Sequence, residues 1–84
     1  MLVCEVVGNI IATRKNDKLK GCTFLLVDST EGQFVAVDNI GAGIGEKVLV
    51  SCGSAARRAF TQDINGTSCD YPVDAAVVGI VDEQ

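Results

Sequence analysis

The chain has 84 residues, which fits a single domain over residues 1–84, and 48% of them are hydrophobic. Its net charge of −4 argues against nucleic acid as a partner, because affinity for phosphate backbones rests mainly on Lys and Arg. No apolar run reaches the roughly 18 residues of a membrane span, and the N-terminal MLVCEVVGNII contains an acid and no basic segment, unlike a signal peptide. We therefore expect no membrane partner.

Short apolar segments separated by Gly, Asp and polar turns follow one another along the chain. Their Val, Ile, Leu and Phe content predicts five strands, over residues 2–13, 19–29, 33–40, 47–52 and 73–83. Between the last two, Ser54 is a suitable N-cap for a helix of about two turns over residues 53–60. Five short strands, one small helix and no βαβ alternation predict a mainly all-β fold, a small closed barrel.

The first and fifth predicted strands are apolar on both faces. In the first, the even positions are apolar throughout, and the odd positions still carry three large aliphatic side chains; the even set is Leu2, Cys4, Val6, Ile10 and Ala12. A barrel whose exterior faces water should alternate more cleanly between apolar and polar residues. We expect another subunit to cover the outer faces, which predicts an oligomer.

The stretch GAGIGE, from Gly41 to Glu46, resembles a phosphate-binding loop at first sight. A dinucleotide fingerprint needs the spacing G-x-G-x-x-G and a following helix, but this spacing is G-x-G-x-G and the strand KVLVSC follows. Glu46 also places a negative charge where a phosphate would bind. The glycines are therefore expected to form a wide turn with positive φ or close backbone approach, and the loop is an interface candidate.

The cysteines Cys4, Cys22, Cys52 and Cys69 form no C-x-x-C pair, and the chain has no histidine. A zinc site would have to gather four distant thiolates, so buried structural thiols in a reducing cytosol are favoured. Without histidine, Ser and Cys nucleophiles lack their usual base, and the carboxylates occur singly. We expect no enzyme, no metal and no cofactor, although a thiol-based redox or metal protein stays open as an alternative.

Three segments together resemble a known family: ATRKNDKLKG (Ala12 to Gly21), VAVDNIGAGIGEKVLVSCGSAAR (Val35 to Arg57) and PVDAAVVGIVD (Pro72 to Asp82). They are similar to the bacterial microcompartment vertex proteins of the EutN/CcmL type, in the order and spacing of that family. The resemblance implies a five-stranded OB-like β-barrel that assembles into a pentamer. It implies no catalysis, but a structural part that closes the fivefold vertices of a polyhedral shell in the bacterial cytoplasm, among hexameric shell proteins.

The resemblance also suggests which residues meet neighbours. Subunit contacts or the central opening would involve two turns that match the family and one acid: Gly41, Ala42, Gly43, Gly45, Glu46, Gly53, Ser54, Arg57 and Asp74. Arg57 is expected to pair with an acid of the next subunit, either Asp74 or Glu46, and Arg14 and Lys15 with the shell rim. The alternative function is an OB-like binding module for nucleic acid or another ligand, which needs exposed aromatic and basic residues.

Overall fold

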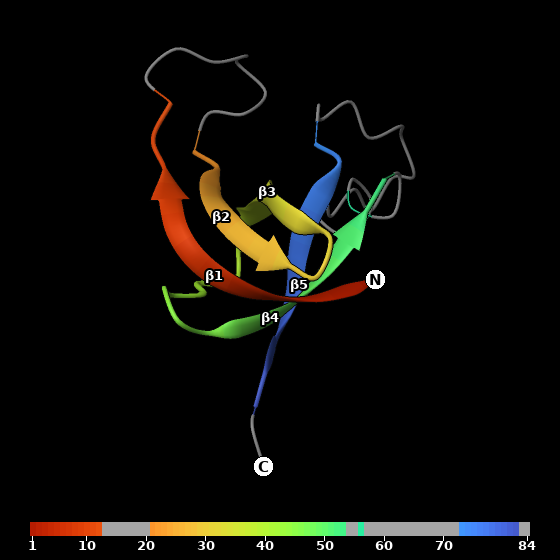
Figure 1. Cartoon of the computed structure of the whole chain (residues 1–84). Coiled ribbons are helices and arrows are strands. Elements are labelled where there is room, and N and C mark those ends of the chain that lie inside the picture. The colour runs from red at the N-terminus through yellow and green to blue at the C-terminus, as the bar shows by residue number, and fades with distance from the viewer. Residues whose placement is uncertain (13–20, 54–55, 57–72, 83–84) are drawn as a thin grey trace.

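The structure, a computed structural model, describes residues 1–12, 21–53, 56 and 73–82. Within these residues it has five strands: β1 (Leu2–Ile10), β2 (Thr23–Ser29), β3 (Gly32–Asp38), β4 (Lys47–Cys52) and β5 (Ala75–Val81). The strands close into one barrel in the order β1-β2-β3-β5-β4 (Figure 1). The predicted all-β barrel of five strands is confirmed.

Four of the five strand pairings that close the barrel are extensive, and one is short. β1 pairs antiparallel with β2 and β4, β2 with β3, and β4 with β5. The remaining contact, between β3 and β5, is parallel and consists of the single residue pair Val37 and Ala76. Each of these two strands therefore has a stretch that is paired on one side only among the described residues.

A bulge in β1 corrects the predicted pattern of its faces. Cys4 and Val6 point into the barrel, but the pairing with β2 shifts by one residue between Val6 and Gly8. One extra residue in a strand reverses the side on which later side chains lie. Ile10 consequently pairs with Phe24 on the outer face. The prediction that Ile10 and Cys4 lie on the same face is therefore wrong.

Strand ends differ from the predicted ones by a few residues. β1 ends at Ile10 where the sequence suggested Thr13, β3 ends at Asp38 where it suggested Ile40, and β5 is shorter at both ends. β4 has the predicted bounds. The predicted helix over residues 53–60 lies outside the described residues apart from its first residue and Ala56, and no helix in the described part is long and apolar enough to cross a membrane.

Apolar side chains pack in two clusters, one on each side of the sheet. The barrel interior holds Cys4, Val6, Leu25, Val27, Ala36, Val48, Val50, Ala75 and Val77. The outer cluster holds Val37, Ala56, Val73 and Ala76, with Phe24 partly buried against it. Part of the apolar outer face is thus covered by the same chain, whereas the prediction was that another subunit covers it.

Candidate assembly surface

The glycine loop ends in a tight turn that is held against β1. The Glu46 amide donates to the Gly43 carbonyl at 3.1 Å, and Gly45 has a φ of 93°, as the third residue of a type II turn requires. The Gly45 amide donates to the Val6 carbonyl at 2.8 Å, and the Val6 amide donates to the Glu46 carbonyl at 2.9 Å. The predicted positive φ is therefore confirmed for Gly45, and also for Gly41, whose φ is 101°, but Gly43 does not have it.

Asp38 organises the start of the same loop, a role that was not predicted from the sequence. Its carboxylate accepts hydrogen bonds from the amides of Ile40 (2.9 Å), Gly41 (3.1 Å) and Ala42 (2.9 Å). Asp38 is only 4% exposed, so the charge is held inside the loop. Because Ala42 packs against the barrel interior, these bonds fix the loop across one end of the barrel.

The carboxylate of Glu46 is also used within the loop. Its Oε1 accepts a hydrogen bond from the Gly43 amide at 2.6 Å, a short distance that is typical of a charged acceptor. Ile44, between these two residues in the turn, is 63% exposed. Ile44 is therefore the large apolar side chain that this turn exposes, and the Glu46 carboxylate supports the turn.

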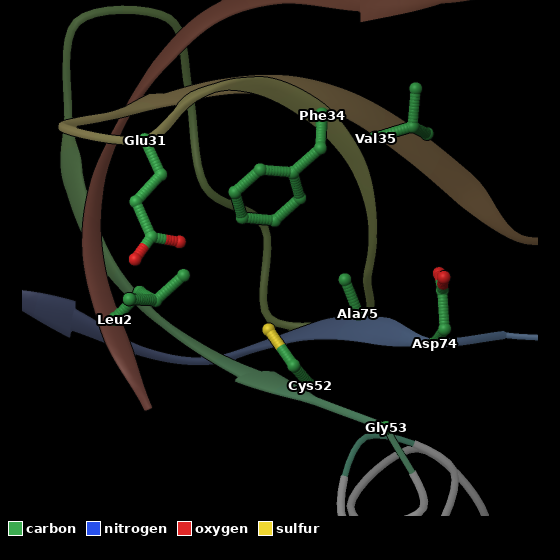
Figure 2. Close-up of a pocket in the computed structure, with 8 residues that line it drawn as sticks. All are labelled: Leu2, Glu31, Phe34, Val35, Cys52, Gly53, Asp74 and Ala75. Carbon is green, nitrogen blue, oxygen red and sulfur yellow. The ribbon is translucent and has the colours of Figure 1, made fainter.

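Gly53 and Asp74 lie at the other end of β4, beside an open hollow of about 530 Å³. The Gly53 amide donates to the Asp74 carbonyl at 2.7 Å, which ties the end of β4 to the start of β5. In Figure 2, the carboxylates of Glu31 and Asp74 lie at opposite ends of the hollow, with the Phe34 ring and the Cys52 sulfur between them. The predicted interface residues thus form two groups, one before β4 and one after it.

Large apolar side chains remain exposed around the barrel. They are Met1, Val3, Ile10, Ile11, Val35, Ile40, Ile44 and Ile80, with exposures from 37% for Ile80 to 88% for Ile11. They come from the strands and loops on several sides, so the barrel has more than one apolar flank. A ring of identical subunits needs two different contact surfaces on each subunit, and this distribution meets that requirement.

The comparisons with known proteins agree with this geometry. Residues 1–82 match the family model described as "Ethanolamine utilisation protein EutN/carboxysome". The carboxysome shell vertex protein CcmL of Thermosynechococcus vestitus is 46% identical over 98% of this chain and 84% of its own length. The shell vertex protein GrpN of Rhodospirillum rubrum is 40% identical over 98% of this chain and 93% of its own length.

The chain belongs to the EutN/CcmL family. Solved structures of relatives share its fold along almost the whole chain. A structure described as the GrpN pentameric microcompartment shell protein from Rhodospirillum rubrum has a TM-score of 0.79 at 39% identity and covers 99% of this chain and 94% of that one. A structure of the ethanolamine utilization protein EutN has a TM-score of 0.85 at 38% identity and covers 100% of this chain and 88% of that one.

The predicted contact residues of this EutN/CcmL protein lie partly within the described residues and partly outside them. Ser54, Arg57, Arg14 and Lys15 lie outside the described residues, so their expected contacts stay predictions. The residues that the structure does describe, Gly41–Glu46, Gly53 and Asp74, are positioned by backbone hydrogen bonds within the subunit. Among residues 1–12, 21–53 and 73–82, no three Cys, Asp or Glu side chains lie together as metal ligands would.

The thiols of this family member occupy different environments. Cys4 is 2% exposed in the barrel interior, Cys22 is half-buried and Cys52 is exposed at the hollow, so the prediction of a buried thiol is confirmed for Cys4 alone among the three described cysteines. Burial, reinforced by Cys52 and then by Asp28, raises the pKa of the Cys4 thiol above its ordinary value. The interior therefore favours the neutral thiol.

We expect this raised pKa to lower the free energy of unfolding as the pH becomes alkaline. Above about pH 8.5 the unfolded chain loses the Cys4 proton while the folded chain keeps it, so stability present at lower pH is lost as pH rises toward the raised folded pKa. The free energy of unfolding should fall more steeply between pH 8 and 10 for the wild type than for Cys4→Ala, by at most about 1.4 kcal/mol per pH unit. Urea unfolding in the presence of a reductant measures both slopes. Cys52→Ala should give an intermediate slope, because it removes one of the lesser causes of the raised Cys4 pKa and leaves burial in place. Equal slopes for the wild type and Cys4→Ala would contradict the expectation.

Proposed function

We propose that this chain is a structural shell protein that forms pentamers and caps the fivefold vertices of a bacterial microcompartment, without catalysing a reaction. The observation that carries the proposal is the match, over nearly the full length of both chains, to a relative described as a pentameric shell protein. The exposed apolar side chains on more than one flank support the same conclusion, because a ring would bury them.

The proposed pentamer would meet hexameric shell proteins at its outer rim. In this arrangement Gly41–Glu46 and the Gly53–Asp74 pair belong to subunit contacts or to the central opening, and Arg14 and Lys15 to the rim. Arg57 would pair with Asp74 of the next subunit in preference to Glu46, because the Glu46 carboxylate already accepts the Gly43 amide.

The charge of the chain also bears on the alternative, an OB-like module that binds nucleic acid. The sequence has eleven acidic and seven basic residues, and this negative balance disfavours binding to phosphate backbones. Phe24 is partly buried against the outer cluster, which leaves less of its ring available for base stacking. We therefore propose that the protein binds no nucleic acid.

Native mass spectrometry tests the proposal directly. The chain has a mass of 8.8 kDa, so the main species should weigh about 44 kDa, five times that value, at micromolar concentration. The assembly should persist at moderate salt, because burial of apolar surface is not screened by ions. A protein that stays monomeric in the same range would contradict it. Co-purification of the pentamer with hexameric shell proteins would test the proposed contact between its outer rim and those proteins.

A further inference from the structure

The C-terminal half of β5 has a free edge. β4 pairs with β5 along its length, from Cys52 opposite Ala75 to Lys47 opposite Val81, but β3 pairs with β5 only at Ala76. Figure 1 shows β5 running past β3 and out of the barrel toward the C-terminus. Among the described residues, the stretch Gly79–Val81, beyond the bulge at Val78, thus has a strand neighbour on one side only.

The side chains report the same lack of cover. Cys4, Val48 and Ile80 lie next to one another in one row across β1, β4 and β5. Their exposed fractions are 2%, 0% and 37%, so the row is closed at β1 and β4 and opens at β5. Ile80 stands at the open end of this row, so its side chain would be shielded from water only if a further segment lay beside β5.

Residues Val77–Val81 carry neither charge nor proline, two of the features that keep strand edges from pairing with other strands. Natural edges carry charges or proline, or are covered by another segment, because unpaired amides and carbonyls attract a second strand. From Val77 to Val81 the residues are Val, Val, Gly, Ile and Val. Gly79 adds no side chain, and the Leu49 side chain lies 3.7 Å from where its Cβ would be. The stretch therefore presents backbone amides and carbonyls flanked only by apolar side chains, which a second strand could pair with.

We propose that the free edge Gly79–Val81 adds to an extended strand of a neighbouring copy of this chain when the ring forms. The inference rests on the proposed function, because the assembly supplies the second copy. Addition of a strand pairs the open amides and carbonyls and covers Ile80. β3 has a second open edge at Gly32–Val35, where Val35 is 42% exposed. Two different edges on one subunit suit the head-to-tail contact of a ring.

Residue-resolved amide hydrogen exchange of the wild-type assembly tests this without a variant. In a strand paired on one side, alternate amides point toward the partner, so slow and fast exchange should alternate along residues 79–82. If a second strand is added, consecutive amides in Gly79–Val81 should all exchange slowly, with differences of less than about tenfold between neighbours. Alternating protection in an assembly of pentameric mass would overturn the inference while leaving the proposed function intact. A monomeric wild type would overturn both.

A pair of matched substitutions gives a second test. Ile80→Lys places an ammonium group at the free edge, and the 37% exposure of the side chain lets the charge reach water in the isolated subunit. We expect the protomer concentration at which half of the rings dissociate to rise at least about tenfold. Asn9→Lys adds the same charge at an exposed polar residue of β1, away from the free edge, and should shift this concentration less than about threefold. Circular dichroism confirms that each variant is folded; a folded Ile80→Lys variant that assembles like the wild type would overturn the inference.

Discussion

Replacement of Asp38 with Asn should lower the free energy of unfolding by about 2–4 kcal/mol. The Asp38 carboxylate is 4% exposed and accepts three amides, those of Ile40, Gly41 and Ala42, with both of its oxygens. Asn has nearly the same shape but turns one oxygen into an NH₂ group, which would face amide donors. At least one part-buried amide then loses its acceptor, and the charge that strengthens the other bonds is removed.

Asp28→Asn is the matched control for this substitution. Asp28 is exposed on β2 and lies opposite Glu5, so two like charges face each other across the strands. Removal of one charge should change stability by less than about 0.5 kcal/mol, or raise it slightly. Urea unfolding at one fixed protomer concentration compares the two variants, since the stability of an oligomer depends on concentration. If Asp38→Asn were as stable as Asp28→Asn, Asp38 would not be the residue that holds the loop.

Much of the barrel could be predicted because local patterns determine it. Runs of Val, Ile and Leu between glycine turns identify the five strands, and β4 has the predicted bounds because the glycine loop precedes it and Gly53 follows it. The bulge in β1 could not be predicted, since Val6 and Val7 are both apolar and a shift by one residue leaves the apolar run unchanged.

Some features of the assembly surface could be predicted from the sequence and others could not. The role of Asp38 could have been predicted from the sequence. Asp38 stands at the end of a strand and is followed by Asn39 and, two residues after that, by Gly41. An aspartate in such a turn commonly accepts hydrogen bonds from the backbone amides that follow it. The free edge of β5 could not be predicted, since it depends on how far β3 and β5 run together, a parallel contact between segments almost forty residues apart in the chain. The hollow beside Asp74 likewise joins residues from every strand except β2.

Gly45→Ala should lower the free energy of unfolding by about 1–2 kcal/mol, and Gly43→Ala, two residues away in the same turn, should change it by less than about 0.5 kcal/mol. At Gly45 no atom lies within 4 Å of the added Cβ, so the penalty comes from the backbone, whose φ of 93° is unfavourable for any residue with a side chain. At Gly43 φ is not positive, and the added Cβ would meet the Glu46 Oε1 at 3.4 Å, the movable end of a long side chain.

The two alanine variants separate backbone conformation from packing as the reason for glycine in this loop. Both lower the conformational entropy of the unfolded chain equally, so this contribution cancels in their comparison. Urea unfolding at equal protomer concentration should therefore place Gly45→Ala about 1–2 kcal/mol below Gly43→Ala. If the order were reversed, with the larger loss at Gly43, the loop would need glycine there for a close approach that appears only in the assembly, and the neighbouring subunit would be the group that approaches.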